Sequence, residues 1–76
     1  MARIKTTKPK MYNYLWLKIR LWQRLNGVTD ETLASFVEVS PRTFRDYDKS
    51  AFNMPIGKLD NFLLASGLTL EQLMSL

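Results

Sequence analysis

Residues 30–49 read DETLASFVEVSPRTFRDYDK, and this stretch decides the fold of the 76-residue chain. Thr29 precedes it as a helix N-cap, and two acidic residues in the first turn complement the helix dipole. Glu38 begins a tight connection. Ser40 is then a second N-cap, and Pro41 occupies the first position of a new helix. The stretch therefore predicts two short helices joined by a short turn.

Apolar residues fall on one side of each of these two helices. A helix pair with a short turn needs a small residue where the helices cross and apolar residues that hold them at a fixed angle. Ala34 is the small residue at the crossing. The apolar contact positions are filled by Leu33, Val37, Val39, Phe44 and Tyr47.

The flanking sequence predicts three further helices. No glycine or proline interrupts residues 10–26, and Gly27 supplies a helix stop. Pro55 opens a fourth helix that ends at Gly67, with four residues expected to face inward: Ile56, Leu59, Phe62 and Leu63. The T-x-x-Q pattern of residues 69–72 is a capping box that starts a short final helix. Because no segment alternates apolar and polar residues at length, the prediction is an all-α, five-helix domain over residues 10–76.

The first predicted helix carries two apolar stripes on nearly opposite sides. One consists of Tyr12, Leu15, Ile19 and Trp22, and the other of Tyr14, Leu17, Leu21 and Leu25. A helix that is apolar on two sides must bury both. A homodimer is expected, in which the second stripe joins the terminal Leu73, Met74 and Leu76. The alternative is a sealed monomer whose last helix folds over that stripe.

Residues 30–49 resemble the helix-turn-helix motif of the phage repressor and Cro family, also called the xenobiotic-response-element family. The resemblance extends from about Leu15 to the C-terminus. It implies a five-helix, lambda-repressor-like domain that regulates transcription by binding double-stranded DNA as a dimer. Three positions depart from the family pattern. Glu38 replaces a turn glycine, which costs on the order of 1 kcal/mol or reshapes the turn; Asp30 replaces a phosphate-binding glutamine; Asp46 lies on the recognition helix.

The exposed side of the predicted helix from Pro41 to Lys49 offers donors to base edges. Three basic residues lie within an arc of about 60° opposite the apolar side, with one acid beside them. Arginine pairs with guanine and aspartate accepts from cytosine in the major groove. The predicted DNA-reading residues are Ser40, Pro41, Arg42, Thr43, Arg45, Asp46 and Lys49. The alternative is a solvated face on which Arg42 and Asp46 form a surface pair. Arg20, on the first helix, is expected to reach a phosphate at most.

Charge is segregated along the chain. Residues 1–29 hold seven basic groups and no acid, whereas residues 30–76 hold four basic and seven acidic groups. This front-loaded charge favours nucleic acid as partner, and an anionic membrane second. Residues 1–9 are predicted to form a flexible basic arm without an amphipathic apolar face, which disfavours the membrane. The predicted phosphate contacts are Arg3, Lys5, Lys8 and Lys10.

Composition excludes several classes of protein. Without cysteine or histidine the chain has no disulfide framework, no Cys/His zinc site and no thiol or imidazole catalysis. No phosphate-binding or dinucleotide-binding glycine loop occurs. No enzyme, cofactor or metal is expected, and the absence of an apolar run of about 20 residues favours a cytoplasmic protein.

The alternative function is a helix-turn-helix fold used for protein contact, as in an antitoxin, a phage inhibitor of a host nuclease, or an adaptor.

Overall fold

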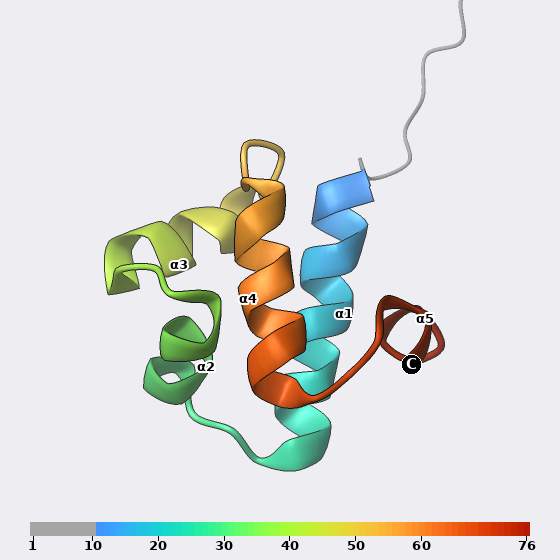
Figure 1. Cartoon of the computed structure of the whole chain (residues 1–76). Coiled ribbons are helices and arrows are strands. Elements are labelled where there is room, and N and C mark those ends of the chain that lie inside the picture. The colour runs from blue at the N-terminus through green and yellow to red at the C-terminus, as the bar shows by residue number, and fades with distance from the viewer. Residues whose placement is uncertain (1–10) are drawn as a thin grey trace, which may run out of the picture.

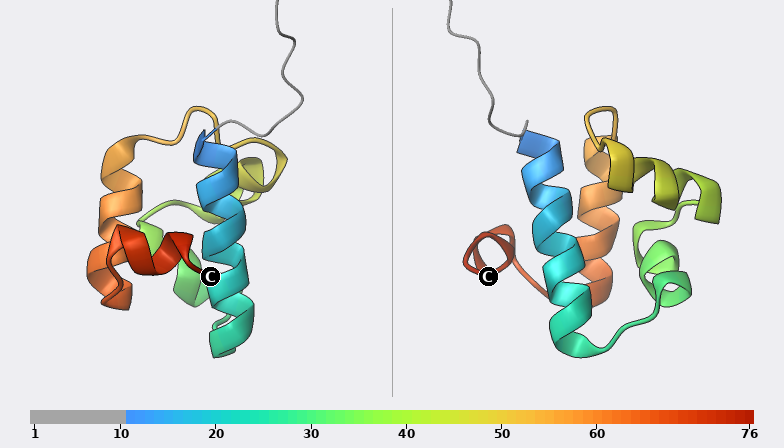
Figure 2. Two further views of the ribbon diagram at one scale, coloured as in Figure 1. Left: turned by 90° about the vertical axis from the view of Figure 1, so that its right-hand side faces the viewer. Right: turned by 180° about the vertical axis from the view of Figure 1, so that it is seen from behind.

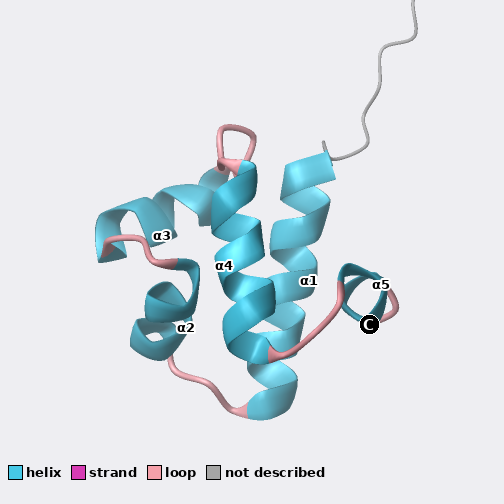
Figure 3. Ribbon diagram, in the orientation of Figure 1, coloured by secondary structure: helices cyan, strands magenta, loops and turns pink. Residues whose placement is uncertain are grey.

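The computed structural model describes residues 11–76, and within that range helices are the only regular secondary structure. In chain order the elements are α1 (Met11–Asn26), α2 (Asp30–Val37), α3 (Pro41–Lys49), α4 (Ile56–Ser66) and α5 (Leu70–Met74). In Figure 1, α2 and α3 lie to one side of α1 and α4, while α5 lies on the other. The rotated views in Figure 2 show α5 crossing beside α1, and Figure 3 shows short loops joining all the helices. The all-α prediction is therefore confirmed, with each helix starting within one residue of its expected position.

Local capping explains where the helices begin. The hydroxyl groups of Thr29 and Ser40 each accept a hydrogen bond from a backbone N–H three residues later, at 3.1 Å. Thr69 and Gln72 form both bonds of the capping box. These side chains satisfy backbone donors that the first turn of a helix otherwise leaves unpaired.

The turn between α2 and α3 has the left-handed backbone conformation that glycine usually supplies. Glu38 has φ 64° and ψ 54°, and its N–H donates to the carbonyl of Ala34 at 2.8 Å. Two side chains of α4 secure this end of α2: Lys58 donates to the carbonyl of Glu38 at 2.8 Å, and Asn61 donates to that of Val37 at 3.5 Å. The turn is therefore not reshaped, and tertiary contacts hold it despite the side chain of Glu38.

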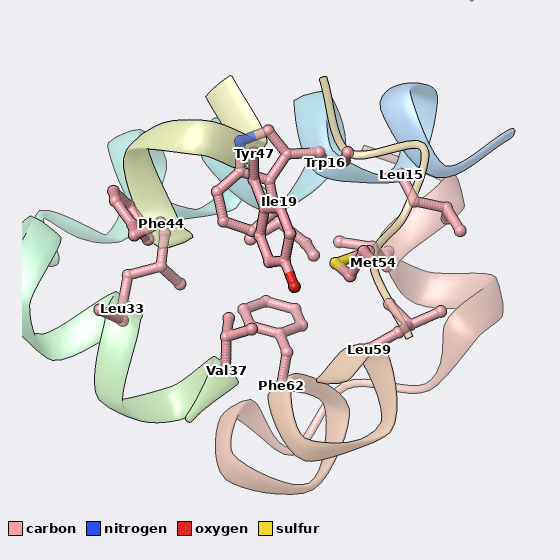
Figure 4. Close-up of a cluster of buried hydrophobic side chains, with 13 residues drawn as sticks. Leu15, Trp16, Ile19, Leu33, Val37, Phe44, Tyr47, Met54, Leu59 and Phe62 are labelled. Carbon is pink, nitrogen blue, oxygen red and sulfur yellow. The ribbon is translucent and has the colours of Figure 1, made fainter. Parts of the chain in front are cut away.

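The core gathers side chains from all five helices and from the loop before α4 (Figure 4). Trp16 lies at its centre, with its ring edge-on to Phe44 and Tyr47, both at 5.3 Å between centroids. The thirteen buried apolar residues are Leu15, Trp16, Ile19, Leu33, Ala34, Val37, Phe44, Tyr47, Ala51, Met54, Leu59, Phe62 and Leu73. All five predicted contact positions between α2 and α3 are buried or half-buried, as the pattern of residues 30–49 predicted.

The expectations for Ile56 and Leu73 were wrong, and the sealed monomer that was the alternative for α1 is not formed. Ile56 is 68% exposed, because the buried arc of α4 is centred between Leu59 and Phe62 and the first residue of the helix lies beyond its edge. On α1 the second apolar stripe is not sealed: Leu17 is 59% and Leu25 64% exposed. The last helix packs against α1, but its Leu73 points into the core of the same molecule and is unavailable to a second copy.

Candidate functional site

The outer face of α3 is the most strongly charged helix surface among the described residues. Arg42, Arg45, Asp46 and Lys49 are exposed on it. The opposite side of the same helix is buried through two aromatic residues that contact Trp16. The core thus fixes which side of α3 faces water, and the predicted cluster of basic residues is brought together.

The first turn of α3 presents the remaining predicted residues. Ser40 and Pro41 are exposed, whereas Thr43 is half-buried. The Thr43 hydroxyl accepts a hydrogen bond from the Ser40 hydroxyl at 3.1 Å. Thr43 is therefore partly covered and its oxygen partly engaged, whereas the other six predicted residues are exposed.

The charges on this face have no partner within residues 11–76. No ion pair or side-chain hydrogen bond joins Arg42, Arg45, Asp46 or Lys49 to another described residue. The surface pair between Arg42 and Asp46, which was the alternative interpretation, is not formed. Two guanidinium groups and one ammonium group are therefore available to a ligand, and guanidinium groups suit planar, bidentate acceptors.

Behind α3, a polar network connects it to α1 and α2. Arg20 of α1 lies 3.0 Å from Asp30 and 3.3 Å from Asp48, measured between side-chain nitrogen and oxygen. Gln23, which is buried, donates to Asp30 at 2.7 Å and accepts from Arg20 at 2.8 Å. These hydrogen bonds, first from Gln23 and then from Arg20, lower the pKa of Asp30 below its usual value. The two carboxylate partners of Arg20 are separated from it in sequence by 10 and 28 residues, and no local pattern marks them.

A second feature lies between α4 and α5, away from α3. Apolar side chains line a groove of about 350 Å³: Ile56, Leu59, Leu63 and Leu70, together with Gly57 and Asp60. On the neighbouring surface of α4, Leu64 is 76% exposed. Sequence reasoning missed this groove, because it placed Ile56 inside.

The buried phenol of Tyr47 completes the electrostatics of α3. Burial raises its pKa above the usual value for tyrosine, since the low-dielectric interior disfavours the phenolate. The ring therefore stays neutral and acts in packing.

Other kinds of site find no support within residues 11–76. That range holds no group of three or more acidic, histidine or cysteine side chains able to hold a metal ion, and none of its helices is long and apolar enough to cross a membrane. The predicted arm contacts, from Arg3 to Lys10, lie outside the described residues. Comparison with known proteins found no matching family model, no similar curated protein and no similar solved structure.

Proposed function

We propose that this chain is a cytoplasmic, sequence-specific DNA-binding protein, a transcriptional regulator of phage or mobile-element type. In this proposal α2 and α3 are a helix-turn-helix, and α3 enters the major groove. Short helices joined across a left-handed residue, with a buried aromatic side and a charged outer side, support the assignment.

The observation that carries the proposal is a set of three cations on the outer face of α3 that have no ion pair to any residue from 11 to 76. Arg42 and Arg45 can each donate two parallel hydrogen bonds to guanine O6 and N7, and Lys49 can neutralise a phosphate or reach a guanine. Asp46 lies beside them and can accept from cytosine N4.

The ion pair of Asp30, the first residue of α2, weakens an objection to DNA binding. A carboxylate there would repel a phosphate, but the charge of Asp30 is met by Arg20 at 3.0 Å. Glu31 remains exposed without an ion pair to any described residue. We therefore assign the phosphate contacts to the basic arm rather than to the first turn of α2.

A salt-dependent binding titration against random and genomic DNA fragments tests the function. One tightly bound fragment, with log affinity falling by about 0.9 per phosphate contact against log salt, is the expected result. Deleting residues 1–9 should weaken binding to all fragments together and flatten that slope. Absence of binding at low salt would overturn the proposal.

We also propose that the protein binds as a homodimer, because one helix-turn-helix contacts too few base pairs to select a genomic site, and dimers span half-sites about 34 Å apart. The exposed apolar residues of α1 and of the C-terminal residues 74–76 supply the surface: Tyr14, Leu17, Leu25, Met74 and Leu76. Sedimentation equilibrium over a roughly hundredfold concentration range should show a dimer that Leu17→Asp disrupts. Leu17 is 59% exposed, so this variant should stay folded. A monomer at every concentration, with and without DNA, would contradict the dimer.

A second candidate function is a protein-interaction module with the same fold. The apolar groove between α4 and α5, together with the exposed Leu64, favours it, since soluble monomers seldom leave such surface uncovered without use. The titration separates the two candidates: failure to bind DNA at low salt selects the interaction module.

A further inference from the structure

Arg20 lies at the point where both helices of the proposed helix-turn-helix meet α1. Its guanidinium Nη1 lies 3.0 Å from a carboxylate oxygen of Asp30, the first residue of α2, and its Nε lies 3.3 Å from one of Asp48, in the last turn of α3. These are the only ion pairs within the described residues. One side chain therefore joins the beginning of α2 and the end of α3 to the longest helix.

Neighbouring groups fix the guanidinium and its partner in place. The indole N–H of Trp16 donates to the same Asp48 oxygen at 2.8 Å, so that oxygen accepts a hydrogen bond from one residue of α1 and forms an ion pair with another. The guanidinium also lies over the ring of Phe44, 4.8 Å from its centroid. Two side chains of α3 thus contact Arg20, one through charge and one through its aromatic face.

These contacts bear on the outer face of α3 because a helix moves as a unit. Asp48 immediately precedes Lys49 and follows Arg45 by three residues. A rotation or tilt that released Asp48 from α1 would carry both cations with it. A shift of about 1 Å is enough to break the geometry of bidentate contacts.

We propose that Arg20 is a positioning residue for α3: it sets the orientation of the reading face without touching DNA itself. This inference rests on the proposed function for its effect on DNA. The Arg20 side chain is only 30% exposed, and both Nη1 and Nε already have carboxylate partners. Sequence selectivity is therefore expected to depend on a residue that lies behind the reading helix.

Three variants test this role. Arg20→Met removes the charge but keeps an unbranched apolar stem. Arg20→Lys keeps the charge but lacks the planar fork that reaches two carboxylates. Arg24→Met is the matched control, since Arg24 is exposed on the same helix, has no ion pair to a described residue and carries the same charge.

The affinity of each variant is measured for the DNA fragment that the wild type prefers and for a random fragment, at several salt concentrations. The temperature is one at which circular dichroism shows that every variant is folded. Arg20→Met should lower the ratio of preferred to random affinity by about tenfold, within the range for residues that share one salt-bridge network. Arg20→Lys should recover part of that loss, and Arg24→Met should leave the ratio unchanged. Equal weakening of both fragments by Arg20→Met, with a salt slope reduced by about 0.9, would show a direct phosphate contact and overturn the proposal.

A measurement without DNA separates this proposal from the proposed function. Residual dipolar couplings of the free protein report the angle between α1 and α3. That angle should change in Arg20→Met and stay at its wild-type value in Arg24→Met. If the wild type prefers no DNA fragment, the proposed function is wrong, but the angle between α1 and α3 still tests the positioning role of Arg20. An unchanged angle in Arg20→Met would show that Arg20 does not position α3.

Discussion

α3 and α4 follow one another in the chain, and the surfaces they expose are opposite in kind. α3 exposes two arginines, a lysine and two aspartates, whereas α4 exposes Ile56 at 68% and Leu64 at 76%. Both helices bury an equally apolar inner side, through Phe44 and Tyr47 in α3 and through Leu59 and Phe62 in α4. The contrast between the two helices therefore lies in the chemistry of their exposed side chains, which is charged on α3 and apolar on α4.

The difference determines how each surface interacts with water and with a ligand. Charged side chains stay solvated at no cost, and the cations of α3 gain free energy of binding when they neutralise a polyanion and release the counterions condensed on it. The exposed leucine and isoleucine of α4 remain in contact with water in the monomer, and burying them releases about 25 cal/mol per Å². If the two faces are independent, a substitution on the outer face of α4 should not alter the DNA preference that depends on α3.

The largest effect is expected for Trp16→Ala, which removes the support behind α3. Deleting a buried aromatic side chain typically costs about 3–5 kcal/mol, and Trp16 also contacts Phe44, Tyr47 and Asp48. Urea unfolding monitored by circular dichroism measures the loss. Leu64→Ala, on the outer face of α4, is the control and should change stability by less than about 0.5 kcal/mol. Equal losses of unfolding free energy in the two variants would show that the inner side of the molecule does not contribute more to stability than the outer face of α4.

The second-largest effect is expected for Arg42→Ala, and it concerns DNA sequence preference rather than stability. Loss of a bidentate guanine contact should reduce discrimination at one base pair by about 1–3 kcal/mol. Selection from a randomised DNA pool measures the preference of each variant. Leu64→Ala should leave the preference intact. An unchanged preference for Arg42→Ala would remove this residue from the reading face.

Glu38→Gly should stabilise the protein by about 1 kcal/mol, because glycine adopts the left-handed conformation of this turn without the penalty of a Cβ. The expected rise in melting temperature is roughly 4–8 °C for a domain of this size. The turn is also where α4 touches the α2–α3 pair, through Lys58. A decrease in melting temperature would mean that the side chain of Glu38 stabilises the turn.

The smallest effect concerns acid. The folded-state pKa of Asp30 is lowered below its usual value of about 3.8, so its contribution to stability is present above that value and is lost as pH falls through the lowered pKa. Asp30→Asn should therefore be less stable than the wild type at pH 6. The difference should shrink as pH falls below about 4. Thermal unfolding of both proteins between pH 6 and pH 2 measures it, and a gap independent of pH would show that charge is not the cause.

Much of the fold could be predicted because its signals are local. N-cap residues, Pro41, Gly27 and Gly67 mark helix ends through contacts within one turn, and the structure has the helix ends where those residues placed them. The inner side of α3 was equally predictable from the spacing of Phe44 and Tyr47. Ala51 and Met54 lie between α3 and α4 and both are buried, which no sequence pattern indicated, because a loop can enter the core without any periodic pattern.

Sequence by itself determined which residues share the exposed face of α3, since helix geometry places residues 42, 45 and 49 together whatever surrounds them. Tertiary structure alone decided that Arg20 meets Asp30 and Asp48, that α4 holds the turn at Glu38, and that Leu73 fills the core of its own molecule. The reason is physical. A helical repeat fixes directions around one axis, whereas contacts between helices depend on how several axes pack around a shared core.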